Sequence, residues 1–282
     1  MTNVERYVRP TDLEEAWALI REGKGTARPV GGGVDAALYV PPRVTTLVDL
    51  SDLPLRYIEE DAGALRIGAG VTLSELLERD AVACYLDCII AEVLRHVASP
   101  LLRNVATVGG TIASAHPWSD VIPLFLVLGA EVKLYDGSEH AVPIEEFVAK
   151  RGLAAGALIT EVRLSSPAAG AAVAFEKFTR TGFDVALLNC AVYLRNEGGV
   201  CRDVRVAAGG TPDTAKRIPA IEQVIEGRPL DGETIEAAAA VAEEAIPVRD
   251  DRRASAGYRR ILTSAGVRRC LRRIEARQGG SA

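Results

Sequence analysis

Two glycine-centred loops constrain the fold and the chemistry of this chain more than any other feature. The first is Gly31-Gly32-Gly33-Val34-Asp35 and the second is Thr107-Val108-Gly109-Gly110-Thr111. We interpret the apolar runs that lead into them, Ala27–Val30 and Val105–Val108, as short strands. Glycine lets the backbone approach a ligand closely and turn its amides toward an anion. Neither loop is followed by a lysine that could clamp a phosphate. The pair therefore predicts that the loops hold the two halves of one pyrophosphate, which points to a dinucleotide.

Composition agrees with a dinucleotide-binding globular protein and excludes other classes. The chain has 282 residues, a net charge of −5 and 48% hydrophobic residues. It is long enough for two domains and too acidic for a general nucleic-acid binder. Its five scattered cysteines form no cluster motif. No basic start precedes an apolar core in Met1–Pro10, and no apolar run reaches the ~20 residues of a membrane span. We therefore expect reduced cysteines, a cytoplasmic location and no membrane insertion.

The order of the predicted elements favours an α+β fold. Thr11-Asp12-Leu13-Glu14 and Thr72-Leu73-Ser74-Glu75 are typical of capping boxes that open helices. Val121–Leu128 predicts a buried helix directly after Asp120. Further strands are predicted at Thr46–Leu50, Leu65–Gly70, Glu131–Tyr135, Ala171–Phe178, Ala186–Leu194 and Val200–Ala208, and further helices at Ile89–Val97 and Ala256–Ile274. Because these elements show no regular β-α-β alternation, we predict an α+β architecture.

A nicotinamide-type fingerprint is an alternative for the first loop. Gly31, Gly33 and Ala36 satisfy G-x-G-x-x-A, but that motif has meaning only between a strand and a helix of a β-α-β unit. Only Val34–Val40 separates the glycines from two prolines, and no clear strand delivers Asp52 as a ribose-binding acid. We therefore disfavour a Rossmann domain. Glycine turns without any ligand are the second alternative that the local pattern leaves open.

Four segments carry a resemblance to a known family. Gly31–Ala36 is similar to an A-G-G-T-D-L loop, and Arg103–Asp120 follows R-N-x-A-T-x-G-G-N-x-A-x-A-x-P-x-x-D almost throughout. Phe175–Arg180 resembles Y-x-K-x-x-R, and Asp251–Arg260 resembles D-x-R-x-S-x-x-Y-R-x. Together these segments, which span essentially the whole chain, resemble the FAD-binding medium subunit of molybdenum hydroxylases, the family of the carbon monoxide dehydrogenase and xanthine dehydrogenase flavoproteins.

The resemblance implies a domain plan and a cofactor. It implies a PCMH-type FAD-binding domain at residues 1–170, with subdomains at about 1–56 and 57–170. A smaller C-terminal α+β domain of sheet and helices would follow at residues 171–282. None of the three histidines lies beside the first loop, where a covalent flavin link is expected in a different flavin family, so the FAD is expected to be non-covalent.

The resemblance also implies the residues of the cofactor site. Amides around Gly31–Asp35 and Thr107–Thr111 would contact the pyrophosphate, and Asp120 would bond hydroxyl groups of FAD. Val97 and Ala98 would lie against the flavin or adenine part, Ile159 would pack beside the cofactor, and Lys177 would lie near the isoalloxazine. The full implied set is Gly31, Gly32, Gly33, Val34, Asp35, Val97, Ala98, Thr107, Gly109, Gly110, Thr111, Asp120, Ile159 and Lys177. No catalytic residue and no metal ligand is implied on this chain.

Two positions of this site depart from the family pattern. Val34 stands where a threonine or another hydroxyl residue is usual, which removes one possible donor to phosphate. Thr111 replaces the usual asparagine and has a shorter reach. Neither change removes a backbone amide, so we expect FAD to bind, more loosely than it does with the family's residues.

Several of these residues also have simpler interpretations. Asp120 fits an ordinary helix N-cap, and Lys177 fits a solvated charge on a strand edge. His116 follows the second loop and could approach a phosphate, but His96, His116 and His140 show no metal spacing. The ten arginines between Arg249 and Arg277 fit either a solvated helix face or a face that docks a partner subunit.

The resemblance implies an oxidoreductase subunit. FAD on this chain would take electrons from [2Fe-2S] clusters of a small subunit and pass them to an external acceptor. A large subunit would oxidise the organic substrate at a molybdenum–pterin site, and the complex would be a heterotrimer, assembled as a dimer of heterotrimers. The chain itself carries no cysteine cluster for iron–sulfur centres. A non-catalytic flavin-binding or assembly protein of such a complex is the alternative.

Overall fold

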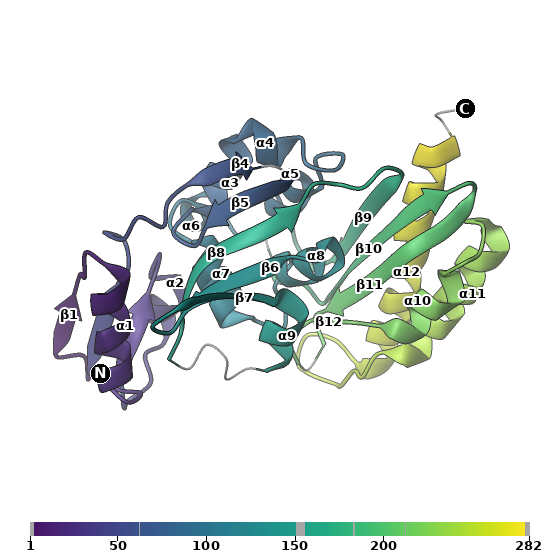
Figure 1. Cartoon of the computed structure of the whole chain (residues 1–282). Coiled ribbons are helices and arrows are strands. Elements are labelled where there is room, and N and C mark those ends of the chain that lie inside the picture. The colour runs from purple at the N-terminus through teal and green to yellow at the C-terminus, as the bar shows by residue number, and fades with distance from the viewer. Residues whose placement is uncertain (1–2, 62, 151–155, 183, 212, 280–282) are drawn as a thin grey trace. The chain divides into compact units, whose positions relative to one another are not determined.

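The computed structural model describes residues 3–61, 63–150, 156–182, 184–211 and 213–279. The chain forms two compact units, and each is built from three chain segments. The first unit contains Met1–Ala81, Ser99–Ser114 and Ala130–Ser165. The second unit contains Val82–Ala98, Ala115–Gly129 and Ser166–Ala282. Both units combine helices and strands (Figure 1), which confirms the predicted mixture of helix and sheet.

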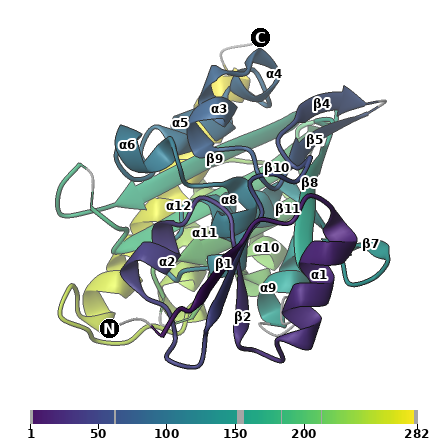
Figure 2. The ribbon, with the colours of Figure 1, turned by 90° about the vertical axis from the view of Figure 1, so that its left-hand side faces the viewer.

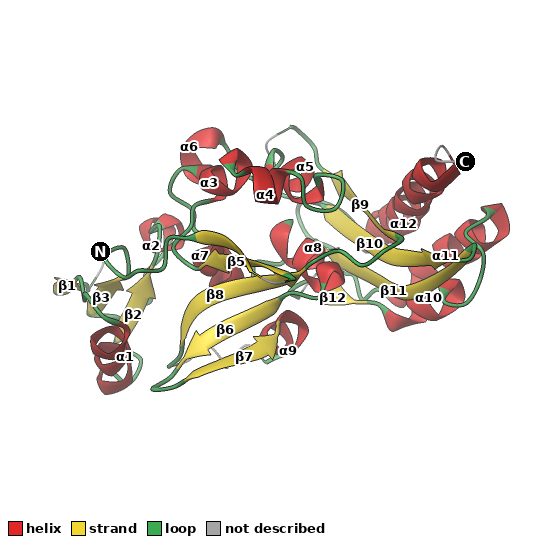
Figure 3. Cartoon of the chain, turned by 45° about the horizontal axis from the view of Figure 1, so that its top comes forward, coloured by secondary structure: helices red, strands yellow, loops and turns green. Residues whose placement is uncertain are grey.

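The first unit begins with a small parallel sheet. Its strands β1 (Arg6–Val8), β2 (Ala27–Val30) and β3 (Thr46–Asp49) pair in the order β1-β3-β2. Helix α1 (Leu13–Glu22) connects β1 to β2 and packs on the sheet, and the short helix α2 (Val34–Leu38) connects β2 to β3 (Figure 3). This local β-α-β-α-β alternation was not predicted, because β1 is short and carries no apolar alternation.

The first helix begins one residue later than the predicted capping box implies. Asp12, and not Thr11, is the N-cap of α1, and its side chain accepts a hydrogen bond from the amide of Glu15 at 2.8 Å. Glu15 in turn accepts from the amide of Thr11 at 3.3 Å. The prediction was wrong by one position because two adjacent residues are both good caps. The second predicted box is confirmed, since Thr72 and Glu75 exchange hydrogen bonds at the start of α3 (Leu73–Glu78).

An antiparallel five-stranded sheet forms the rest of the first unit. The strands β4 (Ile58–Asp61), β5 (Ala64–Gly68), β8 (Leu158–Ser165), β6 (Glu131–Tyr135) and β7 (Glu139–Pro143) pair in that order (Figure 3). Ile67, Val162 and Val132 lie opposite one another on three neighbouring strands, and all three are buried. The helices of this unit besides α1, α2 and α3 are α6 (Pro100–Arg103), α7 (Val108–Ser114) and α9 (Ile144–Ala149), while α4 (Asp80–Ala83) lies where the chain passes to the second unit.

The second unit is a four-stranded antiparallel sheet covered by helices on both faces. Its strands pair in the order β12 (Lys216–Arg217), β11 (Val200–Gly209), β10 (Leu188–Glu197) and β9 (Ala171–Phe178). Its helices are α5 (Ile89–Leu94), α8 (Val121–Leu128), α10 (Pro219–Ile225), α11 (Gly232–Ala245) and α12 (Ala256–Gly279). Successive strand side chains point to opposite faces, so the seven consecutive buried residues of β10 require cover on both.

Two sets of helices provide that cover. One face of the sheet packs against α10, α11 and α12 in a core that contains Val192, Ile235 and Leu271. Helix α8 contacts β10 and β11 from the other side (Figure 2). All eight residues of α8 are buried, as expected of a helix that is apolar all round, which confirms the predicted buried helix. Within the described ranges, no helix has the length and apolar character needed to cross a bilayer.

Candidate functional site

The first glycine loop presents a row of unused backbone donors. It joins the end of β2 at Val30 to the start of α2 at Val34, and Gly33 has a left-handed backbone with φ of +73°. In the part of the chain that the structure describes, the amides of Gly31, Gly32, Gly33 and Val34 donate to no protein acceptor. Successive free amides that include a left-handed residue form a concave site for an anion. This loop therefore has the geometry that phosphate binding requires.

The second glycine loop lies directly against the first, as predicted from the sequence. A Cβ atom on Gly32 would overlap the carbonyl oxygen of Val105, and one on Gly31 would come within 2.6 Å of Thr107 Oγ1. The hydroxyl of Ser114, in α7, also donates a hydrogen bond to the carboxylate of Asp35, in α2. The two loops are therefore one structural site in the first unit, and Gly32 must be glycine for the loops to meet.

Four of the five amides of the second loop are already used within the protein. Those of Val108, Gly109, Gly110 and Thr111 donate, in that order, to Val71 O at 2.9 Å, Ala69 O at 2.9 Å, Thr107 Oγ1 at 3.1 Å and Thr107 O at 2.9 Å. The hydroxyl of Thr111 also donates to the carbonyl of Thr107, at 2.9 Å. The loop thus supplies the surface on which the first loop rests, and protein acceptors hold its amides at Val108–Thr111.

The strand predicted at Val105–Val108 was wrong. Only an isolated bridge between Thr72 and Thr107 forms there, and helix α7 begins at Val108. The amides that would extend a strand instead bond to Val71 and Ala69, about 40 residues earlier in the chain. Such long-range acceptors leave no trace in a local apolar pattern.

The glycines of the second loop differ in how far the fold requires them. A Cβ on Gly109 would lie 2.7 Å from the Cβ of Ala69 and 3.0 Å from its carbonyl oxygen. A Cβ on Gly110 would meet only Thr107 Oγ1, at 3.0 Å. Gly109 is thus needed for packing, whereas the surroundings of Gly110 leave room for a small side chain. Gly110 is the position where a ligand role can be separated from a structural role.

In the second unit, Asp120 is the centre of a buried polar cluster. Its carboxylate accepts from Lys177 Nζ at 2.6 Å and from Asn189 Nδ2 at 2.6 Å. Lys177 also donates to the carbonyl of His96 at 2.8 Å, and Asn189 donates to the carbonyl of Ser119 at 3.1 Å. Asp120 is 4% exposed and Asn189 is fully buried. Three segments of this unit therefore meet at one carboxylate.

The geometry of this cluster excludes the simpler interpretations of its charged residues. Asp120 is the N-cap of α8, but its side chain makes no capping hydrogen bond. The Lys177 side chain is only 11% exposed and is paired, although it stands on the edge strand β9. Burial raises the pKa of the Asp120 carboxyl, and the nearby Lys177 ammonium and Asn189 amide act against that increase. A buried ion pair with hydrogen-bonded partners is costly to build, which marks the cluster as a site of functional interest.

Asn189 is a member of this cluster that was not predicted from the sequence. This residue lies opposite Lys177 in the β9–β10 pair, and it is the polar residue in an otherwise apolar run, Leu188–Leu194, apart from the phenol of Tyr193. A buried amide in such a run indicates a specific hydrogen-bond partner. That signal was present in the sequence, but the partner, Asp120, is 69 residues away.

The remaining implied residues fall into the two units. Val97 and Ala98 follow α5 in the second unit, next to the carbonyl of His96 that Lys177 contacts, and Ala98 has a left-handed φ of +51°. Ile159 is buried in β8 of the first unit, opposite Leu134. Their contacts with FAD stay predictions. So do those of the loop residues and of Asp120 and Lys177.

The histidines and the C-terminal arginines have local partners. His116 stacks on Trp118 with ring centroids 4.7 Å apart. Across the described residues, no three His, Cys, Asp or Glu side chains come together as a metal site. On α12, both Arg268 and Arg272 pair with Glu236 at 2.9 Å. Those two arginines therefore tie α12 to α11, which favours the interpretation of a charged helix face over a docking face.

The comparison with protein families identifies an FAD-binding flavoprotein. A model of the FAD-binding domain in molybdopterin dehydrogenase matches residues 2–167, and a model of the carbon monoxide dehydrogenase flavoprotein C-terminal domain matches residues 173–274. The chain belongs to the family of FAD-binding medium subunits of molybdenum hydroxylases.

Curated relatives and solved structures agree over almost the full length. The chain is 32% identical to the carbon monoxide dehydrogenase medium chain of Afipia carboxidovorans, over 96% of each. It is 32% identical to the nicotine 6-hydroxylase medium subunit of Paenarthrobacter nicotinovorans, over 96% of this chain and 98% of that one. A carbon monoxide dehydrogenase structure from Hydrogenophaga pseudoflava, lacking the Mo-pyranopterin moiety, matches with a TM-score of 0.91 at 28% identity, over 98% and 99% of the two chains. Quinoline 2-oxidoreductase from Pseudomonas putida 86 matches with a TM-score of 0.85 at 28% identity, over 97% of each chain.

Proposed function

We propose that this chain is the electron-transfer flavoprotein subunit of a heterotrimeric molybdenum hydroxylase. FAD held here would receive electrons from the [2Fe-2S] clusters of a small partner subunit and deliver them to an external acceptor. Substrate oxidation would take place at a molybdenum–pterin site on a large partner subunit. The observation that carries the proposal is the row of four unused amides at Gly31–Val34, set against a second glycine loop.

The first loop supplies what a diphosphate needs. A charge-assisted hydrogen bond is worth about 1.5–3 kcal/mol, so several fixed amides compensate for much of the cost of removing a diphosphate from water. These donors are positioned by the β2–α2 turn and by contact with Val105 and Thr107, so they require little reorganisation on binding. An acidic chain gains from this arrangement because it needs no lysine at the phosphate. We assign Gly31, Gly32, Gly33, Val34 and Asp35 to the diphosphate.

We propose that the second loop supports the first loop and contributes less to binding the diphosphate directly. Thr107 holds the first loop in place together with Val105. Gly109 and Thr111 would keep the backbone of the second loop in shape, and the small surface at Gly110 would let the diphosphate approach. A side chain at Gly110 would occupy that approach. Because protein acceptors already hold four of the five amides of this loop, we assign the grip on the diphosphate mainly to the first loop.

The polar cluster of the second unit would hold the hydroxyl-bearing and ring parts of the cofactor. When bound, FAD supplies reversible redox chemistry in its isoalloxazine ring. Asp120 would accept hydrogen bonds from cofactor hydroxyls, and Lys177 keeps that carboxylate oriented. We place Val97 and Ala98 against a ring of the cofactor, and Ile159 beside it. Because Asp120 balances its charge, Lys177 acts here first as an orienting donor.

The proposal extends to the organisation of the complex. We place the FAD-binding domain at residues 1–170 and the C-terminal domain at 171–282, close to the bounds of the two matching family models. The relatives named medium chain or medium subunit support assembly with a small and a large partner, as a dimer of heterotrimers. A cytoplasmic location is supported by the cysteines, all five of which are free thiols.

A flavin assay on the purified chain tests this function. The protein should be yellow and should release about one FAD per chain on denaturation, as a non-covalent cofactor. Its colour should bleach with dithionite and return with an acceptor such as NAD, a quinone or oxygen. A colourless protein that still co-purifies with partner subunits would instead support the assembly-protein alternative.

A further inference from the structure

A cavity in the second unit carries a concentration of positive charge that the proposed FAD site does not use. It has a volume of about 220 Å³ and is lined by Pro117, Trp118, Ala186, Gly210, Thr211, Arg249, Asp251, Arg252, Arg253 and Arg259. None of these ten residues belongs to the set assigned to FAD. Four arginines and one aspartate face one cavity in a chain whose net charge is −5.

One arginine of the cavity is structural. Arg259 is buried and donates to Asp251 at 2.8 Å and to the carbonyls of Leu187 and Arg249 at 3.1 Å and 2.7 Å. Burial of Asp251 acts against its ionisation, but backbone donors at Arg253 and Ala254 and the Arg259 guanidinium lower the pKa of Asp251 to about 2. The carboxylate is therefore charged and neutralised by Arg259. The pair fixes the segment that carries the other three arginines.

The other three guanidinium groups differ from that of Arg259. Among the described residues, neither Arg249, Arg252 nor Arg253 forms an ion pair. Asp184, whose carboxylate responds to the charge of Arg253, is itself paired with Arg180 at 2.9 Å. By contrast, Arg268 and Arg272 of the same unit share Glu236. Unpaired cations around a cavity attract an anion, and guanidinium forks match phosphate oxygens.

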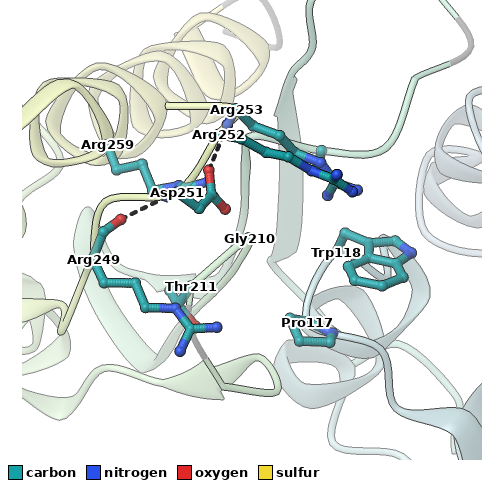
Figure 4. Close-up of a pocket in the computed structure, with 10 residues that line it drawn as sticks. Pro117, Trp118, Gly210, Thr211, Arg249, Asp251, Arg252, Arg253 and Arg259 are labelled. Atoms are coloured by element: carbon teal, nitrogen blue, oxygen red, sulfur yellow. Dashed lines mark hydrogen bonds and ion pairs between the residues drawn. The ribbon is translucent and has the colours of Figure 1, made fainter. Parts of the chain in front are cut away.

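The three free guanidinium groups approach the cavity from opposite sides. Figure 4 shows those of Arg252 and Arg253 directed toward Trp118, and that of Arg249 directed toward Thr211 and Pro117. Arg253 lies over the Trp118 ring at 5.2 Å, and His116 stacks on the same ring. This stacking orders the guanidinium of Arg253 before any ligand arrives, which lowers the entropy cost of binding.

The geometry points to a binding site for a diphosphate group in this cavity, held by Arg249, Arg252 and Arg253. Three converging positive charges match the two to three negative charges of a diphosphate, whereas a single carboxylate would leave guanidinium groups unpaired. The ligand class is therefore a small molecule with a diphosphate, either free or as part of a nucleotide. The site does not depend on FAD binding at the glycine loops.

Titration calorimetry of the full-length chain with inorganic pyrophosphate tests this site. The double variant Arg249→Gln/Arg252→Gln should bind pyrophosphate at least tenfold more weakly than the wild-type chain. The matched control Arg268→Gln/Arg272→Gln removes the same number of charges from α12, outside the cavity, and should bind within twofold of the wild type. ADP should bind at least as tightly as pyrophosphate, since both carry the recognised group.

A second background separates this site from the glycine loops. The Gly110→Val chain should keep its pyrophosphate affinity, and it should lose that affinity when Arg249→Gln/Arg252→Gln is added. The proposal is overturned if the wild-type chain does not bind pyrophosphate, if both arginine pairs matter equally, or if Gly110→Val alone abolishes binding. Binding of ADP without binding of pyrophosphate would also contradict it. Circular dichroism confirms that each variant is folded.

Discussion

Two parts of the molecule, one in each unit, present polar groups in different ways. In the first unit the groups are backbone amides at Gly31–Val34, which are uncharged and have no acceptor among the described residues. In the second unit they are the side chains of Asp120, Lys177 and Asn189, buried and bonded to one another. A site made of backbone is sensitive to the size of side chains, whereas a site made of buried charges is sensitive to their balance. Variants in the two parts should therefore fail for different reasons.

The largest loss of stability is expected when the charge balance between Asp120 and Lys177 is broken. Asp120→Asn keeps the shape of the side chain but leaves the ammonium of Lys177 without its counter-charge. Removing one partner of a buried pair costs about 3–5 kcal/mol, so urea unfolding should show a loss of this size. The additional change Lys177→Met should restore part of it.

An exposed pair of the same chemistry provides the control. Lys133 and Glu139 are 2.6 Å apart but substantially exposed, so Glu139→Gln should change the free energy of unfolding by about 0.5 kcal/mol or less. If Asp120→Asn were equally mild, the buried cluster would not be the charge-balanced centre described here.

The second largest loss of stability is expected from steric overlap at the glycine loops of the first unit. Gly32→Ala places a methyl group on the carbonyl of Val105, and the strain of such overpacking is typically about 1–3 kcal/mol. Thermal unfolding should show a lower Tm, and flavin content should fall with it. Gly232→Ala is the matched control, since a Cβ there meets nothing within 4 Å; its Tm should stay the same or rise. Equal Tm values for the two variants would show that the glycine loops are not packed together.

Loss of ligand without loss of fold is the expected result at Gly110. Gly110→Val adds a side chain where the protein leaves space apart from Thr107 Oγ1, so the Tm should change by only a few degrees. The diphosphate approach is blocked, and FAD retention after gel filtration should fall at least tenfold. A folded Gly110→Val protein with a normal flavin content would remove this residue from the site.

The smallest expected effect is a gain in affinity for FAD. Val34→Thr returns the hydroxyl that the family pattern places beside the loop, and one added hydrogen bond contributes about 0.5–1.5 kcal/mol. The FAD dissociation constant, measured by flavin fluorescence, should decrease by roughly two- to tenfold. Val34→Ala, which changes size without adding a donor, should not produce this gain. Weaker binding by the threonine variant would mean that position 34 does not face the cofactor.

Local sequence signals predicted much of the fold. The buried helix α8 follows from eight consecutive apolar residues, and the cap at Thr72 follows from its partner three positions later. The contact between the two glycine loops was also foreseen, because one ligand was expected to bridge them. The helix and the cap were predictable because their determining interactions are close in sequence.

The features that escaped prediction all depend on partners far along the chain. The amides of Val108 and Gly109 are occupied by Val71 and Ala69, and Asn189 completes the cluster at Asp120 from 69 residues away. The charged cavity is lined by Trp118 and by arginines that lie more than 130 residues later in the chain. No local periodicity encodes these pairings. The different roles of the two loops could therefore be distinguished only from the structure.

The central claim is that the free amides of the first loop, and not those of the second, bind the diphosphate. Amide chemical shifts of the ¹⁵N-labelled chain, recorded without FAD and with reduced FAD bound, test this residue by residue. We expect the Gly31–Val34 amides to move strongly downfield on binding, as amides do when they donate to phosphate, while those of Val108–Thr111 move little. Large shifts at Val108–Thr111 with unchanged shifts at Gly31–Val34 would contradict the account.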